Sequence, residues 1–413
     1  MKARILFLIN TAEYGGAERH LLELVRRLDA SRADATILCY GPDFYSQRLI
    51  DRPDVQVVAP SRVTPGSLLG YWSTFRKLRP LVTVFVKGSM DSFPLPAYVA
   101  ARLAGTRRLI AIEQLIAEAV PARPVGRGLW TSVRRLVGWR ARHLVTYVWM
   151  KRLAQRFLTK TICVSSAVRD RLIEDYGFPR DKTVTIPNGV DLGHFDSICE
   201  NRRQITRHRF ALAPSDVMFV CVARLVPRKR VDIVLEALAL LSPSHPGCRC
   251  LIVGAGPLDE ELRAKSRELG LSESVRFLGF SEDVRPYLEA ADVYVSASEK
   301  EGMPLALVEA MACGLPAVVT DISGHSEAVI NGRTGMLVPP SSVDELANAL
   351  EYLVVHRDEA RRMGIAARER VVECFNNDRN MKAIEQILLP SAACARPGEG
   401  YDSVNGSSSV PEL

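Results

Sequence analysis

Long apolar runs and paired cysteines are both missing from this 413-residue chain. A membrane-spanning helix needs about 20 consecutive apolar residues, whereas the longest mainly apolar run, Leu144 to Met150, has only seven. The nine cysteines are scattered, and the closest two, Cys248 and Cys250, have no second pair with which to form a zinc site or a disulfide framework. These absences argue against membrane-spanning, secreted and metal-stapled classes, and they predict a cytoplasmic protein.

A signal peptide is not evident either. The first ten residues, MKARILFLIN, are apolar over too short a stretch and are soon followed by Glu13 and Glu18. This pattern is typical of a buried first strand. With 47% hydrophobic and 24% charged residues, the composition is that of a globular chain, and its length predicts two domains or more.

Acidic residues are absent from 121–160, although the whole chain has 54 Lys+Arg and 47 Asp+Glu, a net charge of only +7. The segment carries ten basic residues, with Trp130, Trp139, Tyr147, Trp149 and Phe157 among them. It is open to three interpretations: core helices with solvated arginines, contact with an anionic membrane surface, or a nucleic-acid patch. No nucleic-acid motif accompanies it, so we predict no nucleic-acid partner and a possible peripheral position at the inner membrane face.

Short apolar runs alternate with helical patterns, which predicts parallel, doubly wound α/β sheets. The first set of predicted strands is Ile5–Ile9, Thr36–Tyr40, Val55–Val58, Val82–Val86, Leu109–Ile112, Thr161–Val164 and Val184–Ile186. The second set is Met218–Ala223, Arg249–Val253, Val275–Leu278, Val293–Ser296, Ala317–Val319 and Met336–Val338.

Two sets of strands predict two Rossmann-like domains, over residues 1–195 and 196–375. We expect the polar, arginine-rich residues 196–215 to be the linker between them. Residues 376–391 are predicted to form a last helix that packs back on the N-terminal domain, and the Gly- and Ser-rich residues 392–413 a disordered tail.

Two glycine turns that follow predicted strands are candidate anion sites. Gly15 and Gly16 stand before a predicted helix, where backbone N–H groups can approach an anion, although a tight turn without a ligand explains them equally well. Gly254 opens a Gly-Ala-Gly-Pro turn in which Asp259 occupies the third glycine position of a dinucleotide fingerprint. An NAD site is therefore excluded. The remaining interpretation is that this turn is a ligand-binding loop at the carboxyl edge of a sheet.

Two further segments carry charge at the ends of predicted strands. Arg224, Arg228, Lys229 and Arg230 lie within seven residues and suit a polyanion such as a diphosphate, unless they simply form a solvated basic loop. In the stretch EGMPLALVEAMACGLP, which begins at Glu301, the prolines and glycine predict a helix from about Pro304 to Gly314. Its two glutamates, Glu301 before the helix and Glu309 inside it, can accept hydrogen bonds from sugar hydroxyls, or they are surface residues of an ordinary helix.

Taken in order, these motifs resemble glycosyltransferase family 4, the group-1 retaining glycosyltransferases with the GT-B fold. The resemblance runs from Ile5 to about Leu389. It rests on GGAE (Gly15–Glu18), IPNGVD (Ile186–Asp191), ARLVPRK (Ala223–Lys229), IVGAGP (Ile252–Pro257), VRFLGF (Val275–Phe280), EGMPLALVE (Glu301–Glu309), GLPAVVTDISGHSE (Gly314–Glu327) and NGRTGMLVP (Asn331–Pro339).

The resemblance implies two Rossmann-like domains facing across a cleft, with a nucleotide-sugar donor on the C-terminal domain. It implies that Arg224 and Lys229 bind the diphosphate and that Glu301 binds the sugar hydroxyls, and these three are the implied catalytic residues. It further implies that Glu309 binds the ribose, that Phe280 and Ser281 lie near the base, and that Gly254 belongs to the ligand-side loop. Backbone contacts to the donor are implied for Gly302, Met303, Pro304 and Leu305, and closure from the other domain for Gly16. No metal or cofactor is expected, because cations can offset the charge of the leaving diphosphate and no Asp-x-Asp pair is present.

On the acceptor side the sequence departs from the family pattern. Family members often carry a His after an N-terminal strand, and the matching stretch here contains Glu113 and Gln114 instead. We expect Gln114 or a backbone carbonyl to substitute for it, and we assign Glu113, Gln114 and Asn188 to the acceptor side. A second departure is Arg230, which replaces the small residue that usually follows the diphosphate-binding Lys and either contacts phosphate or faces solvent.

The predicted function is transfer of a hexosyl or N-acetylhexosaminyl group from a nucleoside-diphosphate sugar to a sugar or lipid-linked acceptor, in polysaccharide or glycolipid assembly. The alternatives are a nucleotide-sugar epimerase or a sugar-phosphate synthase of the same fold, and a non-catalytic protein that binds through its basic surface.

Overall fold

The computed structural model describes residues 2–9, 15–39, 41–59, 67–87, 95–115, 148–195 and 199–389. These residues divide into two compact units. Unit 1 consists of Met1–Cys163, Arg169–Ile186 and Met381–Leu413, and unit 2 of Val164–Val168 and Pro187–Asn380. The predicted tail, 392–413, and residues 121–147 of the basic segment lie outside the described residues.

The described strands of unit 1 form a seven-stranded parallel sheet in the order β3-β2-β1-β4-β5-β6-β7. Its strands are β1 (Ala3–Ile9), β2 (Ala33–Cys39), β3 (Gln56–Val58), β4 (Val82–Lys87), β5 (Arg108–Glu113), β6 (Lys160–Cys163) and β7 (Thr183–Thr185). Its helical elements are α1 (Gly16–Arg27), α2 (Pro42–Arg48), α3 (Leu68–Leu78), α4 (Leu95–Leu103), most of α6 (Ser166–Glu174) and η1 (Arg180–Lys182).

Strand order decides which face of this sheet each helix covers. The chain winds outward from β1 in one direction through β2 and β3 and then restarts on the other side with β4. Because parallel crossovers are right-handed, α1 and α2 cover one face while α3 and α4 cover the other. Neighbouring side chains of β4 point to these two faces. Val84 belongs to the core beneath α1, whereas the ring of Phe85 contacts that of Tyr98 in α4 at a centroid distance of 4.3 Å.

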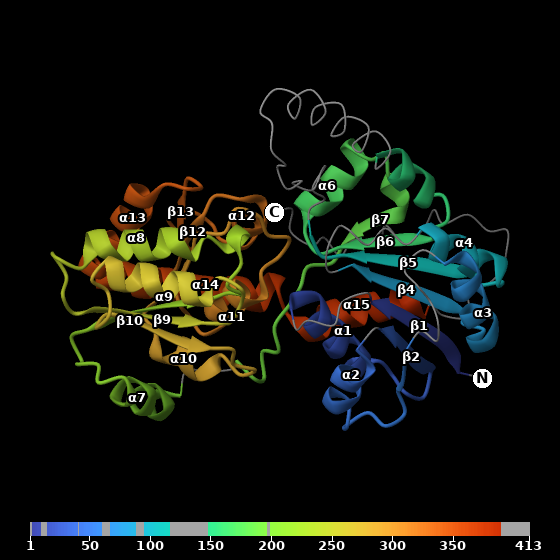
Figure 1. Ribbon diagram of the computed structural model, residues 1–413, viewed down its shortest axis with the longest axis horizontal. Coiled ribbons are helices and arrows are strands. Elements are labelled where there is room, and N and C mark those ends of the chain that lie inside the picture. Colours follow the sequence, from blue (N-terminus) through green and yellow to red (C-terminus); the bar gives the residue numbers. More distant parts are fainter. Residues whose placement is uncertain are drawn as a thin grey trace. The chain divides into compact units, whose positions relative to one another are not determined.

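The last helix, α15 (Asn377–Leu388), carries the chain into unit 1, where Met381, Ile384 and Leu388 join the core beneath α1. In Figure 1 this red helix lies beside the blue α1. Arg108 donates to the carbonyl oxygens of Ile387 and Leu388, which satisfies acceptors that the end of a helix leaves free. From Met381 onward, the C-terminal helix is thus a structural part of unit 1.

The described strands of unit 2 form a six-stranded parallel sheet in the order β10-β9-β8-β11-β12-β13. Its strands are β8 (Val217–Val222), β9 (Cys248–Val253), β10 (Val275–Gly279), β11 (Val293–Ser296), β12 (Ala317–Thr320) and β13 (Gly335–Val338). Its helical elements are α7 (Glu200–Arg209), η2 (Pro227–Lys229), α8 (Val231–Leu241), α9 (Asp259–Glu268), α10 (Arg285–Ala290), α11 (Leu305–Ala312), α12 (Ser323–Ala328), α13 (Val343–Val355) and α14 (Arg357–Cys374).

Side chains of β8 show that helices cover both faces of this sheet. Phe219 and Cys221 belong to the core that includes α8 and α13, whereas Met218 and Val220 belong to the core that includes α10, α11 and α14. A strand buried on both faces reads as a continuous apolar run, as VMFVCV does here. The predicted fold class, two doubly wound α/β domains, is therefore confirmed, and each predicted strand overlaps an observed one.

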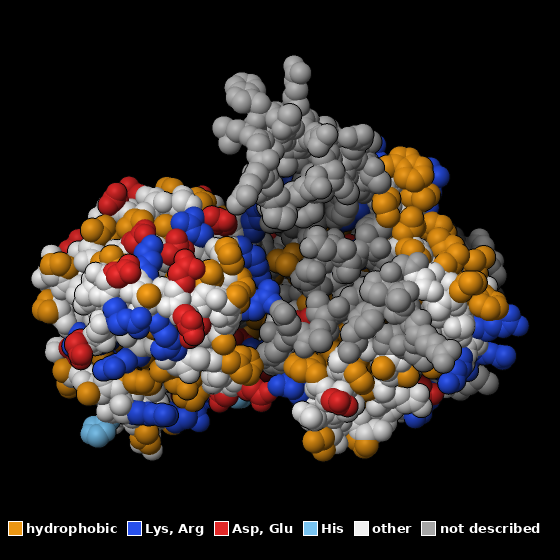
Figure 2. All heavy atoms as spheres, in the orientation of Figure 1, with side chains coloured by type: hydrophobic (Ala, Val, Ile, Leu, Met, Phe, Trp, Pro, Cys, Tyr) orange, Lys and Arg blue, Asp and Glu red, His pale blue; other side chains and the backbone are white. Residues whose placement is uncertain are grey.

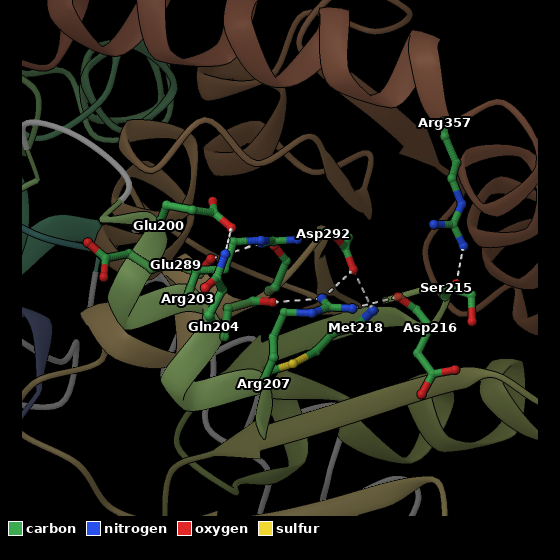
Figure 3. A network of polar contacts seen from close by, with 12 residues as sticks. Glu200, Arg203, Gln204, Arg207, Ser215, Asp216, Met218, Glu289, Asp292 and Arg357 are labelled. Atoms are coloured by element: carbon green, nitrogen blue, oxygen red, sulfur yellow. Dashed lines mark hydrogen bonds and ion pairs between the residues drawn. The ribbon is translucent and has the colours of Figure 1, made fainter. Parts of the chain in front are cut away.

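The arginine-rich segment predicted as a linker is partly helical, so that prediction was wrong for residues 200–209. Helix α7 packs on α10, and its arginines reach acidic side chains there (Figure 3). Arg203 and Arg207 both donate to Asp292, at 2.6 and 3.0 Å, and Arg202 pairs with the buried Glu289. The half-buried Arg203 and Arg207 and the buried Thr206 line the inner face of this helix, so its sequence has no apolar periodicity that would predict a packed helix.

In the part of the chain that the structure describes, no helix is long and apolar enough to cross a membrane.

Asp292 should contribute measurably to the stability of unit 2, because it accepts from two arginines and from the backbone N–H of Met218. Asp292→Ala leaves the half-buried Arg203 and Arg207 without their shared anion, and we expect it to lower the free energy of unfolding by about 2 kcal/mol. Asp358→Ala, which removes an acid whose side chain is 85% exposed, is the control and should cost under about 0.5 kcal/mol. Denaturant unfolding followed by circular dichroism measures both, and equal effects would contradict the anchoring role.

Candidate functional site

The predicted donor residues gather at one place, the carboxyl edge of the unit 2 sheet. Arg224 follows β8, Gly254 follows β9, Phe280 follows β10 and Glu301 follows β11. Since the strands are parallel, these four positions meet at the same edge. The winding direction reverses between β8 and β11, and ligands of open α/β sheets bind at such a reversal. Topology therefore brings the Arg/Lys loop and the Glu301 loop to the two sides of that point.

An ion pair joins the two loops. Lys229, in η2, donates to the carboxylate of Glu301, and Arg228 contacts its second oxygen at 3.4 Å. The backbone N–H of Glu299 also donates to the carbonyl oxygen of Arg228 at 2.9 Å. The Glu301 side chain is 6% exposed, so it is a buried anion held by two cations. The two cations thus compensate the charge of the carboxylate.

The Glu301 carboxylate stays ionised under all ordinary conditions. Burial by itself would raise the pKa of Glu301, but the charges of Lys229 and Arg228, with His325 nearby, lower it to about 2. An acceptor that is permanently charged can receive hydrogen bonds from hydroxyl groups but is a poor proton donor or base. The geometry therefore favours binding of hydroxyls by Glu301 rather than proton transfer.

His325 lies close to this carboxylate and is completely buried. Its Nδ1 is 2.9 Å from the carbonyl oxygen of Thr320, so Nδ1 carries the proton of the neutral ring. Burial lowers the pKa of His325 to about 4, against the opposite effects of Glu301 and Thr320. The ring is thus neutral at pH 7, and its Nε2 has no partner among the described residues.

Helix α11 places Glu309 on the same side as Glu301. The helix starts after Pro304 and ends before Gly314, whose φ of +73° suits glycine, so the predicted helix boundaries are confirmed. Glu309 is 2% exposed, and both carboxylates lie near the buried Tyr294. Burial raises the pKa of Tyr294, and Glu301 and Glu309 raise it further, because a phenolate beside carboxylates is disfavoured.

Three glycines let backbone segments approach closely around the site. A Cβ on Gly254 would stand 1.9 Å from the carbonyl oxygen of Ala223, and one on Gly256 would stand 2.3 Å from that of Leu225. The turn after β9 therefore supports the loop that carries Arg224. A Cβ on Gly324, in α12, would stand 2.7 Å from the carbonyl oxygen of Glu301 and 2.8 Å from that of Gly302. In the same way, α12 supports the Glu301 loop.

Asn188 also contacts this loop. It belongs to unit 2, is buried, and its amide donates to the carbonyl oxygen of Met303 at 3.1 Å. The structure thus places Asn188 against the predicted donor loop of unit 2, and its acceptor-side role stays a prediction.

The remaining donor candidates differ in exposure. Arg224 is exposed, Gly302 and Met303 are buried, and Pro304 and Leu305 are half-buried where α11 begins. Phe280 is 52% exposed, which is unusual for an aromatic side chain. Ser281 follows it and donates to the carbonyl oxygen of Asp283 at 2.7 Å.

Arg230 is directed to acidic side chains. It donates to Asp232 and, at 2.8 Å, to Glu299, and it contacts Ser341 at 3.1 Å. Its φ of +46° is a left-handed conformation that costs a non-glycine residue about 1–2 kcal/mol. The ion pairs offset this cost, and they explain how an arginine occupies a position where the family usually has a small residue.

The acceptor-side candidates of unit 1 lie in a buried ionic cluster at the ends of β4 and β5. Lys87 donates to Glu113 at 2.5 Å, and Lys151 lies over the ring of Tyr176 at 4.7 Å. Burial alone would raise the pKa of Glu113, yet Lys87 and Lys151 lower it. Burial lowers the pKa of Lys151 to about 8, against the effect of Glu113. Gln114 is buried beside Glu113.

Gly16 begins α1 in unit 1, and its approach to a donor stays a prediction. Among the described residues, no group of three His, Cys, Asp or Glu side chains could hold a metal ion. Four residues near these candidates were not predicted from the sequence: His325, Gly324, Lys87 and Lys151. Gly324 and His325 belong to the SGHSE stretch, whose residues give no indication that it lies near Glu301. Strand β12 and helix α12 bring this stretch to Glu301.

Comparisons with known proteins agree with this geometry. A family model described as glycosyltransferase family 4 matches residues 14–194, and one described as glycosyl transferases group 1 matches residues 203–370. A GDP-mannose-dependent alpha-(1-6)-phosphatidylinositol monomannoside mannosyltransferase of Mycobacterium tuberculosis is 30% identical over 389 residues, which cover 89% of this chain and 94% of that protein.

Two further relatives extend the comparison. A UDP-Gal:alpha-D-GlcNAc-diphosphoundecaprenol alpha-1,3-galactosyltransferase of Escherichia coli is 29% identical over 248 residues, 59% of this chain and 64% of that protein. The crystal structure of Anabaena HepE in complex with UDP matches 94% of this chain and 99% of its own, with a TM-score of 0.75 and 22% identity.

Gly324→Ala should damage the site without unfolding the protein. The added methyl group meets backbone atoms of Glu301 and Gly302, which cannot rotate away, so the loop must shift. Displacement of a positioning group by about 1 Å lowers the rate of a catalysed reaction on the order of 100-fold. We expect a loss of that size in kcat/KM for the reaction that this site catalyses. Gly247→Ala is the control, because the close contact of its methyl group, at 3.0 Å, would be with the movable carboxylate of Asp216, while the backbone of Asp216 stays at 3.9 Å. A circular dichroism spectrum checks folding, and unchanged kcat/KM for Gly324→Ala would contradict the supporting role.

The stability that Glu301 provides should depend on pH in a defined window. Its pKa of about 2 lies below the ordinary value of 4.5, so in this interval the folded state binds fewer protons than the unfolded state. Its contribution is complete above about pH 5 and is lost as the pH falls toward 2. Relative to Glu301→Gln, the free energy of unfolding of the wild type should therefore decline more steeply between pH 5 and 3. Parallel declines in denaturant titrations of the two proteins would contradict the shift.

Proposed function

Because the chain belongs to glycosyltransferase family 4, the group-1 glycosyltransferases with the GT-B fold, it is a glycosyltransferase, and we propose that it transfers a sugar from a nucleoside diphosphate to a hydroxyl of a lipid-linked acceptor with retention of configuration. The observation that carries this proposal is the pairing of Lys229 with Glu301 across the winding reversal of the unit 2 sheet. It brings phosphate-binding cations and a hydroxyl-binding carboxylate to one point.

Each group has a role that its environment supports. Lys229 and the exposed Arg224 bind the diphosphate and stabilise the negative charge that grows on it as the bond to the sugar breaks. Glu301, permanently ionised, accepts from the sugar hydroxyls, and Glu309 from the ribose. Arrival of the diphosphate gives Lys229 a second anionic partner. No side chain is assigned as a nucleophile, and retention follows from attack on the face that the diphosphate leaves.

Two relatives guide the choice of acceptor. The names of the mycobacterial and Escherichia coli enzymes specify a phosphatidylinositol mannoside and a diphosphoundecaprenol-linked sugar, both lipids, while their donors, GDP-mannose and UDP-galactose, differ in base and sugar. We therefore propose a lipid-linked sugar acceptor and a role in glycolipid or polysaccharide assembly at the inner membrane face. The donor base and sugar are to be identified by experiment.

The test starts from the purified chain. A thermal-shift screen with UDP-, GDP- and ADP-sugars identifies the donor, and incubation with labelled donor and lipid-linked sugars measures transfer, with NMR of the anomeric centre reporting the configuration of the product. Lys229→Ala and Glu309→Ala should each lower kcat/KM at least about 100-fold, because each removes a group aimed at the donor.

Lys265→Ala is the matched control, since Lys265 also pairs with a glutamate of unit 2, Glu236. This variant should transfer as the wild type does. Full activity of Lys229→Ala and Glu309→Ala would overturn the site assignment. Conversion of the donor in the absence of any acceptor would instead favour an epimerase, and an inverted product would overturn the retaining mechanism.

A further inference from the structure

His325, in α12 of unit 2, carries a buried nitrogen atom that no described residue satisfies. The charged side chains of unit 2 that Figure 2 shows lie at its surface, where acidic and basic groups are interspersed and water can solvate them. The ring of His325, by contrast, is completely buried, and its Nε2 has no hydrogen-bond partner among the described residues. A buried polar atom without a partner destabilises a fold, so it points to a partner that the chain itself does not supply.

Bonds on one side of the ring determine which nitrogen is the donor. Nδ1 lies 2.9 Å from the carbonyl oxygen of Thr320 and 3.2 Å from the hydroxyl oxygen of the same residue. That hydroxyl already donates to the carbonyl oxygen of Ser298 at 2.5 Å, so both oxygens of Thr320 are acceptors for the proton on Nδ1. Nε2 of the neutral ring is therefore an acceptor. Because the two nitrogens of an imidazole point in different directions, Nε2 is directed away from Thr320.

Neighbouring contacts place this ring at the candidate donor site. The preceding residue, Gly324, packs so closely on the Glu301 loop that a Cβ there would stand 2.7 Å from the carbonyl oxygen of Glu301. Burial has the largest effect on the pKa of His325 and lowers it, while the charge of Glu301 raises this pKa and that of Lys229 lowers it. His325 thus lies close to both members of the ion pair that joins the two loops.

Glu301 and His325 present two acceptors close to each other. The carboxylate of Glu301 is ionised and Nε2 carries a lone pair, so neither group can donate to the other. Lys229 and Arg228 donate to the carboxylate, but neither of them bonds to Nε2. A ligand that satisfies both acceptors must supply two donors from neighbouring atoms. Adjacent hydroxyl groups of a sugar ring do so, whereas the ionised phosphate oxygens of a nucleotide are acceptors themselves.

We propose that Nε2 of His325 accepts a hydrogen bond from one hydroxyl of the transferred sugar, beside the hydroxyl that Glu301 accepts. The site then selects a sugar with two neighbouring free hydroxyl groups. It rejects a sugar in which the hydroxyl that faces Nε2 is missing or blocked, because the buried nitrogen would stay unpaired in that complex. The inference rests on the proposed function and deepens it by naming the class of sugar.

Two substitutions separate the roles of the ring nitrogens. His325→Asn keeps an amide donor near the position of Nδ1, and with it the bond to Thr320, but has no atom at the position of Nε2. His325→Gln places an amide oxygen near that position and restores the acceptor. Titration calorimetry with the full chain measures the affinity for the sugar nucleotide that the thermal-shift screen identifies and for the matching nucleoside diphosphate.

His325→Asn should bind the sugar nucleotide about 10-fold more weakly than the wild type, because one hydrogen bond to a buried acceptor is lost. It should bind the nucleoside diphosphate, which has no sugar, as the wild type does. His325→Gln should stay within about threefold of the wild type for both ligands.

A set of donors that each lack one sugar hydroxyl gives the sharper test. The wild type should bind the donor without the hydroxyl that faces Nε2 about 10-fold more weakly than the intact donor. His325→Asn should bind these two donors equally, because their difference was the bond to Nε2. His356→Asn is the matched control, since His356 is exposed and its Nδ1 also lies 2.9 Å from a carbonyl oxygen, that of Tyr352. This variant should bind every donor as the wild type does.

The outcomes distinguish this inference from the proposed function. Equal affinity of the wild type and His325→Asn for the sugar nucleotide would overturn the inference and leave the proposed function intact. Weaker binding of the nucleoside diphosphate by His325→Asn, without recovery in His325→Gln, would show a structural role and would also overturn it. A wild type that binds no sugar nucleotide would overturn the proposed function and, with it, the inference.

Discussion

The pairing of Lys229 with Glu301 depends on the central constraint of unit 2, which is that the carboxyl ends of its parallel strands all lie at one edge of the sheet. Glu301 is buried, and a buried carboxylate is tolerated only beside cations that compensate its charge. Those cations come from the loop after β8, while Glu301 follows β11, the neighbour of β8 across the winding reversal. Strand order thus decides which charges meet, and this meeting supports the binding of a diphosphate and a sugar that we propose.

Close backbone packing keeps the two loops in position. Gly254 and Gly256 let the turn after β9 lie against Ala223 and Leu225, and Gly324 lets α12 lie against Glu301. Since backbone atoms have no rotamers with which to give way, these contacts are rigid. The two sides of the site are therefore held by close backbone packing as well as by the charged residues.

The two units use charge differently. In unit 2, arginines of α7 neutralise Asp292 and Glu289 and hold a helix on the fold, as Figure 3 shows for Arg203 and Arg207. In unit 1, by contrast, Arg76 and Lys77 of α3 are exposed. The same residue types thus anchor a helix in one unit and face solvent in the other.

The sequence by itself determined the alternation of strands and helices and the bounds of α11, because these depend on local periodicity and on prolines and glycines. Its short motifs also predicted the donor residues. It misread α7, whose inner face is made of arginine, and it carried no sign that Asn188 meets Met303 or that His325 lies near Glu301. Those contacts join residues far apart in the chain. Only the tertiary structure decided them, since strand order and close packing, not spacing along the sequence, determine which side chains become neighbours.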